Sequence, residues 1–463
     1  MRTAPLACVA AALALLACSA PGSTDEPSPT ALVLITVDTL RADRLGAYGS
    51  ERGLTPNLDA LAAESLVFDA AYAPTPFTVP SLVSLHTGLH PLSLGLQINS
   101  SEVAPEALTL AEALAERGWK TAAVVSNAVL RGREDVAQGF EIYDDTMLQE
   151  EAIRRWPERI AADTTDAAIR LLDTWRGDAR VADAPLFLWV HYQDPHGPYT
   201  PPPGWRERFL AAERSRDPRR LPTGAGSHGE GGIPRYQQID EHDEAAFYRA
   251  GYDGEIAYLD GELGRLLDAL REKGLGERLV FAADHGESMG EDDYWFAHGN
   301  DLTDPLLRVP LFVRWPGLAP GRRGDVARLA DLHPTLLGAL LDAPPTSPDA
   351  TRDLLAPEAA QGASVPLLTT LAVYPHRRLG IVADGYKLIL TLRSGVWTSR
   401  LHRRGDESID LAAPAPHVAS ALRERVWALR DERTAAAAAP LRPVDEQERR
   451  QLEALGYTAE PAE

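Results

Sequence analysis

The sequence predicts an α/β fold, with a large, mixed but mainly parallel sheet between layers of helices and a small antiparallel sheet with one helix after it. Three observations predict it. Short, continuous apolar runs alternate with segments of helical periodicity, as in sheets buried on both faces. Several of these runs end on polar side chains. After residue 343 the pattern changes to shorter β-like runs and one last helix.

Four apolar runs have the length and composition of buried strands. In parallel sheets ligands bind beyond the carboxyl ends of the strands, so the polar residues that follow these runs are candidates for one site. The runs and their polar successors are residues 31–37 before Asp38, 121–125 before Ser126 and Asn127, 186–190 before His191, and 279–283 before Asp284 and His285.

Helices are expected between these strands. Thr55 and Pro56 offer an N-cap and a first-turn proline, and residues 106–117 are rich in Ala and Leu up to Gly118. Leucines from residue 256 to 270 keep helical spacing, with Gly274 as the expected C-cap. Residues 213–240, rich in Gly, Arg and Pro, are expected to form a long surface loop.

The C-terminal part is expected to be a smaller unit packed on the main domain. Its predicted elements are β-like runs at residues 372–374, 379–382 and 387–392 and a helix at 418–433. We therefore divide the chain into a main domain at 31–343, an α+β subdomain at 344–440 and a tail at 441–463.

The charge of the chain limits its partners. Lys and Arg number 46 against 67 Asp and Glu, which gives a net charge of −21. We expect no nucleic-acid partner, because such a surface repels phosphate backbones, and the sequence indicates no protein partner. An anionic substrate then needs a local positive field, and a bound metal ion supplies one.

The first residues resemble a bacterial lipoprotein signal. Residues 1–17 combine a basic start with an apolar stretch too short to span a bilayer, and small residues precede Cys18. Cleavage there frees the Cys18 thiol for lipidation, and residues 18–30 serve as a flexible tether. The expected location is the cell envelope, with attachment to the membrane through Cys18. An ordinary secretory signal is the alternative.

Thr78 begins a segment that reads as a capped helix. Pro80 falls in its first turn and Gly88 is placed to end it, so Thr78 is expected at the N-cap. Alone, these residues describe an ordinary helix. A hydroxyl at a helix N-terminus also lies where anions are stabilised, and metal coordination would turn it into a nucleophile.

Metal ligands are expected at the same edge of the sheet. Asp38, Asp284 and His285 each follow an apolar strand, and with Thr78 they provide three oxygens and one nitrogen. Such a set favours one zinc ion in tetrahedral geometry, with calcium, magnesium and manganese as alternatives.

Histidines in neighbouring loops are candidates for contacts with substrate. His196 and His298 are expected to hold the substrate's non-bridging oxygens or to protonate the leaving group. Together with Asp194 they are also the candidate ligands of a second ion. His191 fits a structural role and a site role equally well. His86, His90 and His228 are expected to be structural or on the surface.

Motifs along residues 32–410 resemble the sulfatase family of the alkaline phosphatase superfamily, and they occur in that family's order. The resemblance implies an alkaline-phosphatase-like fold, a metal site and Thr78 as nucleophile. The matching segments are Val37-Asp38-Thr39-Leu40-Arg41, Thr78-x-Pro80-Ser81 through Thr87-Gly88, Asp194-Pro195-His196, Tyr252-Asp253-Gly254-Glu255 and Asp284-His285-Gly286-Glu287.

Several positions depart from the family pattern. Sulfatases carry a cysteine or serine that is converted to formylglycine, and Thr78 cannot undergo that chemistry. Leu82 replaces an expected arginine, Thr39 replaces a second acidic residue, and Ser126-Asn127 replaces a Lys-x-His motif. The remaining set is similar to that of phosphoethanolamine transferases and lipoteichoic acid synthases, which use a threonine nucleophile.

The expected function is therefore a metal-dependent hydrolase or transferase of anionic esters with a covalent intermediate on Thr78 and a preference for phosphate mono- or diesters. Hydrolysis of sulfate esters is the first alternative. A catalytically degenerate binding protein on the cell surface is the second.

Overall fold

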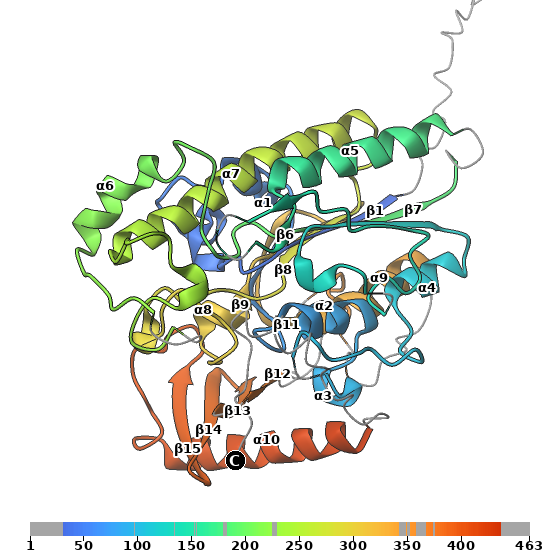
Figure 1. The fold of residues 1–463 in the computed structure, drawn as a ribbon. Coiled ribbons are helices and arrows are strands. Elements are labelled where there is room, and N and C mark those ends of the chain that lie inside the picture. Colours follow the sequence, from blue (N-terminus) through green and yellow to red (C-terminus); the bar gives the residue numbers. More distant parts are fainter. Residues whose placement is uncertain are drawn as a thin grey trace, which may run out of the picture.

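A nine-stranded, mainly parallel sheet forms the centre of the chain, as predicted (Figure 1). The computed structural model describes residues 31–96, 98–133, 135–151, 153, 155–178, 183–224, 229–341, 349, 352–357, 367–373 and 376–436. The strand order is β11-β2-β10-β8-β1-β7-β3-β4, and β9 pairs with β2. The strands are β1 (Ala31–Val37), β2 (Leu66–Tyr72), β3 (Lys120–Val125), β4 (Ile142–Asp144), β7 (Leu186–Tyr192), β8 (Leu279–Ala283), β9 (Arg308–Val309), β10 (Leu311–Arg314) and β11 (Gly321–Arg328).

Helices cover both faces of this sheet (Figure 1). One layer contains α1, α5 and α7, and α6 packs against α7. The other contains α2, α4 and α9. The helices are α1 (Pro56–Ala63), α2 (Thr78–Thr87), α3 (Pro91–Leu94), α4 (Leu110–Ala115), α5 (Ala161–Gly177), α6 (Glu207–Arg216), α7 (Ala245–Glu272), α8 (Asp304–Leu307) and α9 (Leu332–Leu341). A separate short hairpin joins β5 (Gln149–Glu150) to β6 (Pro157–Glu158).

The central strands lack polar alternation because both of their faces are covered. All seven residues of β1 are buried, and β1 pairs in parallel with β7 on one side and β8 on the other. This explains why continuous apolar runs marked these strands in the sequence. β10 runs antiparallel to both β8 and β2, which makes the sheet mixed.

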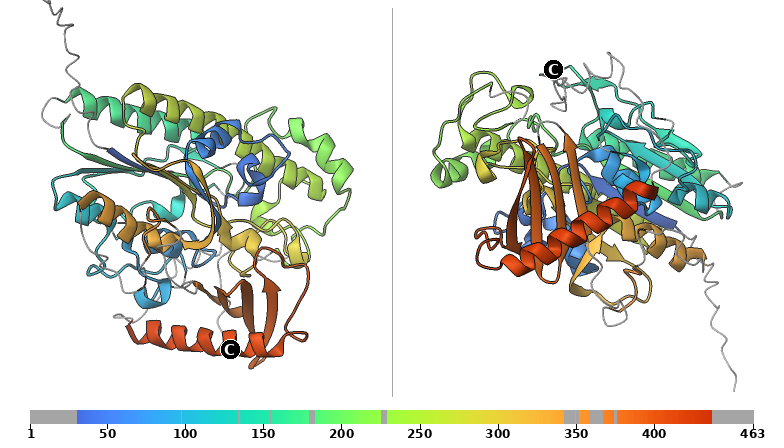
Figure 2. Two further views of the ribbon diagram at one scale, coloured as in Figure 1. Left: turned by 180° about the vertical axis from the view of Figure 1, so that it is seen from behind. Right: turned by 90° about the horizontal axis from the view of Figure 1, so that it is seen from below.

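A four-stranded antiparallel sheet and one long helix follow the main domain, as expected. The strands are β12 (Leu367–Val373), β13 (His376–Ala383), β14 (Tyr386–Arg393) and β15 (Val396–Arg403). Helix α10 (Pro416–Ala436) crosses their outer face (Figure 2). Leu390 and Leu401 of the sheet and Val426 of α10 belong to the small core between them. Sequence patterning missed β15, because its residues are mostly polar or partly exposed.

Three expected elements differ from the structure. The helix expected at residues 106–117 is the shorter α4, which begins after Thr109; the Thr109 side chain and Glu112 form a capping box. Helix α7 starts eleven residues before the leucine pattern, with small and aromatic residues in its first turns. The loop expected at residues 213–240 begins inside α6, and Tyr236 and Gln237 within it are buried.

Several expectations concern residues outside the described ranges. They are the signal and tether at residues 1–30, His228, the domain boundary after 343 and the tail at 441–463. These stay predictions. Within the described residues, no helix has both the length and the apolar character that crossing a bilayer requires.

Candidate metal centre and nucleophile

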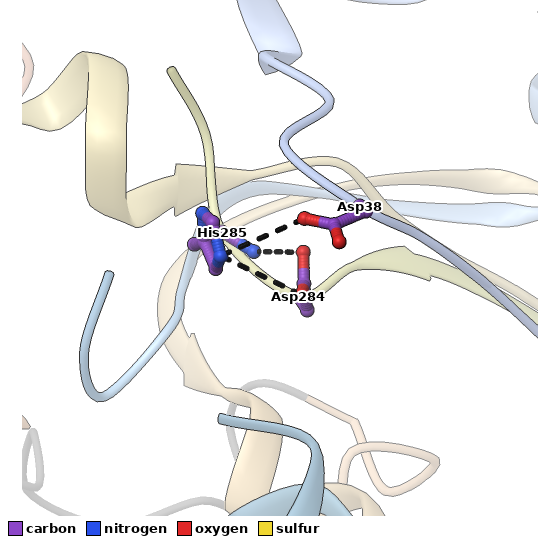
Figure 3. Close-up of side chains that lie close together, drawn as sticks. All are labelled: Asp38, Asp284 and His285. Carbon is purple, nitrogen blue, oxygen red and sulfur yellow. Dashed lines mark hydrogen bonds and ion pairs between the residues drawn. The ribbon is translucent and has the colours of Figure 1, made fainter. Parts of the chain in front are cut away.

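Two carboxylates and one imidazole converge at the carboxyl edge of the central sheet (Figure 3). Nε2 of His285 lies 3.7 Å from Oδ1 of Asp38 and 3.6 Å from Oδ2 of Asp284. All three side chains are buried. Among the described residues, this is the one group of His, Cys, Asp and Glu side chains close enough to share an ion.

Strand register brings these residues together. Val37 pairs with Ala283 across the β1–β8 ladder, so Asp38 and Asp284 leave adjacent parallel strands at the same level. The backbone N–H of Asp284 donates to the carbonyl of Val37 at 3.1 Å and continues this alignment for one residue. Sequence could identify both strand ends but not that the two strands are neighbours.

Each carboxylate has one oxygen held by the protein and one left without a partner. Oδ1 of Asp284 accepts from the backbone N–H of Thr39 at 3.2 Å and of His285 at 2.7 Å. Oδ2 of Asp38 accepts from Nδ2 of Asn127. Oδ1 of Asp38 and Oδ2 of Asp284, the two atoms nearest Nε2 of His285, have no hydrogen-bond partner among the described residues.

Burial makes this pair of carboxylates unfavourable without a cation. Desolvation raises the pKa of Asp284 to about 8, and desolvation together with the charge of Asp284 raises the pKa of Asp38. Buried carboxylates normally pair with a cation or bind a metal. The free oxygens of Asp38 and Asp284, with Nε2 of His285, therefore fit a divalent metal ion.

The imidazole of His285 is oriented by the next residue. Its Nδ1 donates to the carbonyl of Gly286 at 3.0 Å, which leaves the lone pair of Nε2 facing the carboxylates. A Cβ on Gly286 would lie 2.0 Å from the carbonyl oxygen of Pro305, so the turn needs glycine. This is the physical reason for glycine in the Asp-His-Gly sequence here.

Thr78 lies next to this group. Its Oγ1 is 3.4 Å from Nε2 of His285, and the Thr78 side chain is buried. Helix α2, which carries Thr78, is tied to the centre by the Ser81 hydroxyl, which donates to the carbonyl of Asp284 at 2.6 Å. The expectation that Thr78 is the N-cap was wrong by one residue: Phe77 is the extended cap and Thr78 the first helical residue.

Two asparagines lie at the centre; the sequence placed Asn127 after a strand at the expected site without giving it a specific role, and it did not indicate Asn99. Oδ1 of Asn127 accepts from the backbone N–H of Val129 at 2.8 Å, which turns its amide nitrogen toward Asp38. Oδ1 of Asn99 accepts from the backbone N–H of Val79 at 2.9 Å, beside the nucleophile candidate. Nδ2 of Asn99 is buried and has no partner among the described residues.

The ring of one candidate histidine, His298, contacts those of both His285 and His196, tilted against the first and edge-on to the second. The ring of His298 lies 4.6 Å from that of His285 and 5.2 Å from that of His196. Nδ1 of His298 bonds Oε1 of the buried Glu287 at 3.1 Å, and Nδ1 of His196 donates to the carbonyl of Gly197 at 2.7 Å. Both of these bonds use the Nδ1 atom of the ring.

Asp194 does not join these histidines. Its carboxyl interacts with that of Glu255, and burial raises the pKa of Asp194 to about 6. The expected set of Asp194, His196 and His298 for a second ion is therefore not assembled among the described residues. The site holds one group of ligands, with two further histidines beside it.

The chain is similar to proteins described as sulfatases. A family model described as Sulfatase matches residues 30–343. The chain is 26% identical to an ulvan-active sulfatase of Formosa agariphila over 68% of its own length and 62% of that protein's. It is 27% identical to iduronate 2-sulfatase of Homo sapiens over 72% and 73% of the two chains. It is also 27% identical to an arylsulfatase of Clostridium perfringens, over 66% of this chain and 74% of that protein.

Solved structures share the fold. The YidJ protein of Bacteroides fragilis superposes with a TM-score of 0.70 at 19% identity over 90% of this chain and 99% of its own. The phosphonate monoester hydrolase of Agrobacterium radiobacter superposes with a TM-score of 0.65 at 21% identity, over 88% of this chain and 96% of its own. At these identities the likeness concerns the fold alone.

Proposed function

Since the chain belongs to the sulfatase family, we propose that it is a metal-dependent hydrolase or transferase of anionic esters, with Thr78 as its nucleophile. One observation carries the proposal: the Thr78 hydroxyl lies at the edge of a buried group of two carboxylates and one imidazole, and the facing oxygen of each carboxylate has no hydrogen-bond partner among the described residues. Burying these groups is costly for a protein that does not bind a cation there.

Asp38, Asp284, His285 and Thr78 would hold the ion. Carboxylate oxygens, one imidazole nitrogen and a hydroxyl oxygen favour zinc, with calcium, magnesium and manganese as alternatives. When bound, such an ion lowers the pKa of a coordinated hydroxyl and offsets negative charge on a reacting ester. Elemental analysis of the purified protein tests this: one zinc per chain supports the assignment, and metal-free active protein would overturn it.

The side chains of the site then have separate roles in the reaction. Thr78 gives up its hydroxyl proton to solvent, Oγ1 attacks the phosphorus or sulfur, and the bond from that atom to the leaving oxygen breaks. Nδ2 of Asn99, held beside the start of α2, donates to a non-bridging oxygen. His298 or His196, in the imidazolium form, gives its Nε2 proton to the leaving oxygen and becomes a neutral ring. Attack by water or by an acceptor alcohol on the same phosphorus or sulfur then releases Thr78.

Thr78 as the nucleophile favours phosphate esters over sulfate esters as substrates. A threonine is a secondary alcohol, so it forms a simple ester intermediate that a second nucleophile must resolve at phosphorus or sulfur. The fold likeness to a phosphonate monoester hydrolase is consistent with chemistry at phosphorus. The names of the relatives favour the second candidate, hydrolysis of sulfate esters.

Matched substrates separate the two candidates. Aryl phosphate, aryl phosphodiester and aryl sulfate with the same leaving group should be compared by kcat/KM on the zinc-loaded protein. A higher kcat/KM for either phosphorus ester supports the first candidate. A higher kcat/KM for the sulfate, lost in Thr78→Ala, supports the second and keeps the nucleophile.

We also propose that Cys18 is lipidated and that residues 18–30 tether the enzyme to a membrane of the cell envelope. Metabolic labelling with an alkyne fatty acid tests this step. Label on the wild type and none on Cys18→Ala supports the anchor. Unlabelled wild type that is released into the medium contradicts it.

A further inference from the structure

His191 is a buried histidine beside the metal centre whose role the reaction does not explain. It lies in β7 directly opposite Thr36 of β1 in the strand register. Its Nδ1 is 2.9 Å from Oγ1 of Thr36, and its Nε2 is 4.0 Å from Oδ2 of Asp38. Nε2 has no hydrogen-bond partner among the described residues.

A neighbouring tryptophan fixes the direction of these contacts. Nε1 of Trp189 donates to Oγ1 of Thr36 at 2.8 Å. An indole N–H can act only as a donor, so the Thr36 hydroxyl is the acceptor in that bond. A hydroxyl oxygen can accept a second bond, but its own proton also needs an acceptor. Among the described residues, Nδ1 of His191 is the other side-chain partner of this hydroxyl, so the hydroxyl proton is satisfied when it points there.

The tautomer of His191 follows from this chain of bonds. Because Nδ1 accepts from Thr36, the proton of the neutral imidazole sits on Nε2. That N–H points toward Oδ2 of Asp38, the oxygen that Asn127 also holds. The separation of 4.0 Å is longer than a hydrogen bond and places the N–H and the carboxylate in electrostatic contact.

The two oxygens of Asp38 thus have different surroundings. Oδ2 faces the donors of Asn127 and His191, whereas Oδ1 faces Nε2 of His285 and has no partner among the described residues. Donors on the far oxygen of a carboxylate fix which oxygen it presents to an ion. Asp38 follows the last residue of β1, and its backbone N–H still donates to the carbonyl of Tyr192 at 2.9 Å. Asp38 is two residues after Thr36, so strand alternation places both side chains on the same side of the sheet.

We propose that Trp189 and Thr36 hold His191 as its Nε2–H tautomer, and that His191 is thereby a positioning residue that presents Oδ1 of Asp38 to the metal. This inference rests on the proposed metal site. It gives His191 a site role, where the sequence left a structural role equally open.

Metal affinity, rather than activity, tests the proposal. His191→Gln keeps an N–H near the position of Nε2, whereas His191→Met fills similar space without a donor. His333→Met in α9 is the matched control, because His333 is an equally buried histidine whose ring has no partner among the described residues. Zinc dissociation constants are measured for the full-length proteins by competition with a chromophoric chelator.

We expect His191→Met to weaken zinc binding by about 10- to 100-fold, as for other residues that orient metal ligands. His191→Gln and His333→Met should stay within about threefold of the wild type, since neither removes the donor. Wild-type affinity in His191→Met, or equal losses in the Gln and Met variants, would overturn the proposal. A wild type that binds no zinc would instead contradict the proposed function.

A second measurement does not depend on the folding of His191→Met. In protein labelled with ¹⁵N-histidine, the side-chain signals missing from His191→Gln identify His191. Couplings that place the proton on Nε2 support the proposal, and a proton on Nδ1 would overturn it. In Thr36→Val the hydroxyl is lost, so we expect the proton to be shared between the two nitrogens and zinc binding to weaken less than in His191→Met.

Discussion

Nε2 of His285 lies 3.4 Å from Oγ1 of Thr78, although 207 positions separate the two residues in the chain. Nδ1 of His285 is already bonded to a carbonyl, so the Thr78 hydroxyl is the donor in this contact. The same nitrogen faces the free oxygens of Asp38 and Asp284. The candidate nucleophile therefore lies directly beside the candidate metal centre.

Removing the Thr78 hydroxyl should abolish turnover while the protein stays folded. We expect Thr78→Ala to lower kcat by about 10³-fold or more, because a covalent route loses its nucleophile. Thr78→Ser should retain measurable turnover. Thr87→Val, at the other end of α2, removes a buried threonine hydroxyl away from the centre and is the control. Turnover by Thr78→Ala at the rate of Thr87→Val would rule out the nucleophile.

Changing the amide of Asn99 should affect the reaction more than the fold. Asn99→Asp keeps an oxygen to accept from the backbone of Val79 but replaces the free N–H donor with negative charge. We expect kcat/KM to fall by about 10²- to 10³-fold, as when an oxyanion donor is lost. The unfolding midpoint and zinc affinity should change little. Unchanged kcat/KM would show that Nδ2 does not contact the substrate.

Zinc binding should release protons near neutral pH. Burial raises the pKa of Asp284 to about 8 and lowers that of His285 to about 4, so in the metal-free protein Asp284 is protonated at pH 7 and His285 is neutral. Metal binding requires both Asp38 and Asp284 as carboxylates, and burial raises the pKa of each, so affinity should rise by at least about tenfold per pH unit up to about pH 8.

Calorimetry in two buffers of different ionisation enthalpy counts these protons. Burial also raises the pKa of Glu287 to about 8, so in Glu287→Gln the released protons come from Asp38 and Asp284. We expect about one to two protons released at pH 7 in that variant. An affinity independent of pH between 6 and 8, with no proton release, would contradict the account of the buried carboxylates.

Acid should destabilise the fold through two histidines away from the centre. Burial lowers the pKa of His86 to about 3 and that of His333 to about 4, against about 6.5 in an unfolded chain. The folded state therefore binds fewer protons than the unfolded state below pH 6.5. Its stability is complete above that pH and is lost progressively as pH falls toward 4.

Each of these histidines should cost about 2 kcal/mol of unfolding free energy at pH 5 relative to pH 7. His333→Met cannot be protonated, so it should lose less stability over this range than the wild type by about that amount. Urea unfolding at the two pH values measures the difference. Equal losses in the two proteins would show that His333 is protonated in the folded state.

Sequence predicted four central strands of the large sheet and several candidate ligands because buried parallel strands leave a strong local signal. The apolar run of β1 and the polar residue after it are adjacent in the chain, so Asp38 was identified without tertiary information. The same holds for Asp284 after β8. The order of the strands in the sheet depends on contacts between distant parts of the chain. The sequence therefore predicted that Asp38 and Asp284 lie close together but could not show it.

Residues that act through tertiary contacts could not be found in this way. Asn99 lies outside any helix or strand, and its role depends on the amide of Val79 twenty residues earlier. Asn127 follows a predicted strand, and its orientation depends on a bond to Val129. The tautomer of His191 depends on Trp189 and Thr36 together, which no periodicity reveals.

The central claim is a covalent intermediate on Thr78, and intact-mass analysis tests it most directly. Zinc-loaded protein is mixed with excess aryl phosphate, phosphodiester or aryl sulfate, quenched in acid and analysed whole and after proteolysis. We expect a phosphoryl adduct on the peptide that contains Thr78, absent from Thr78→Ala. Turnover of any of these esters with no adduct on Thr78, or an equal adduct on Thr78→Ala, would contradict the account.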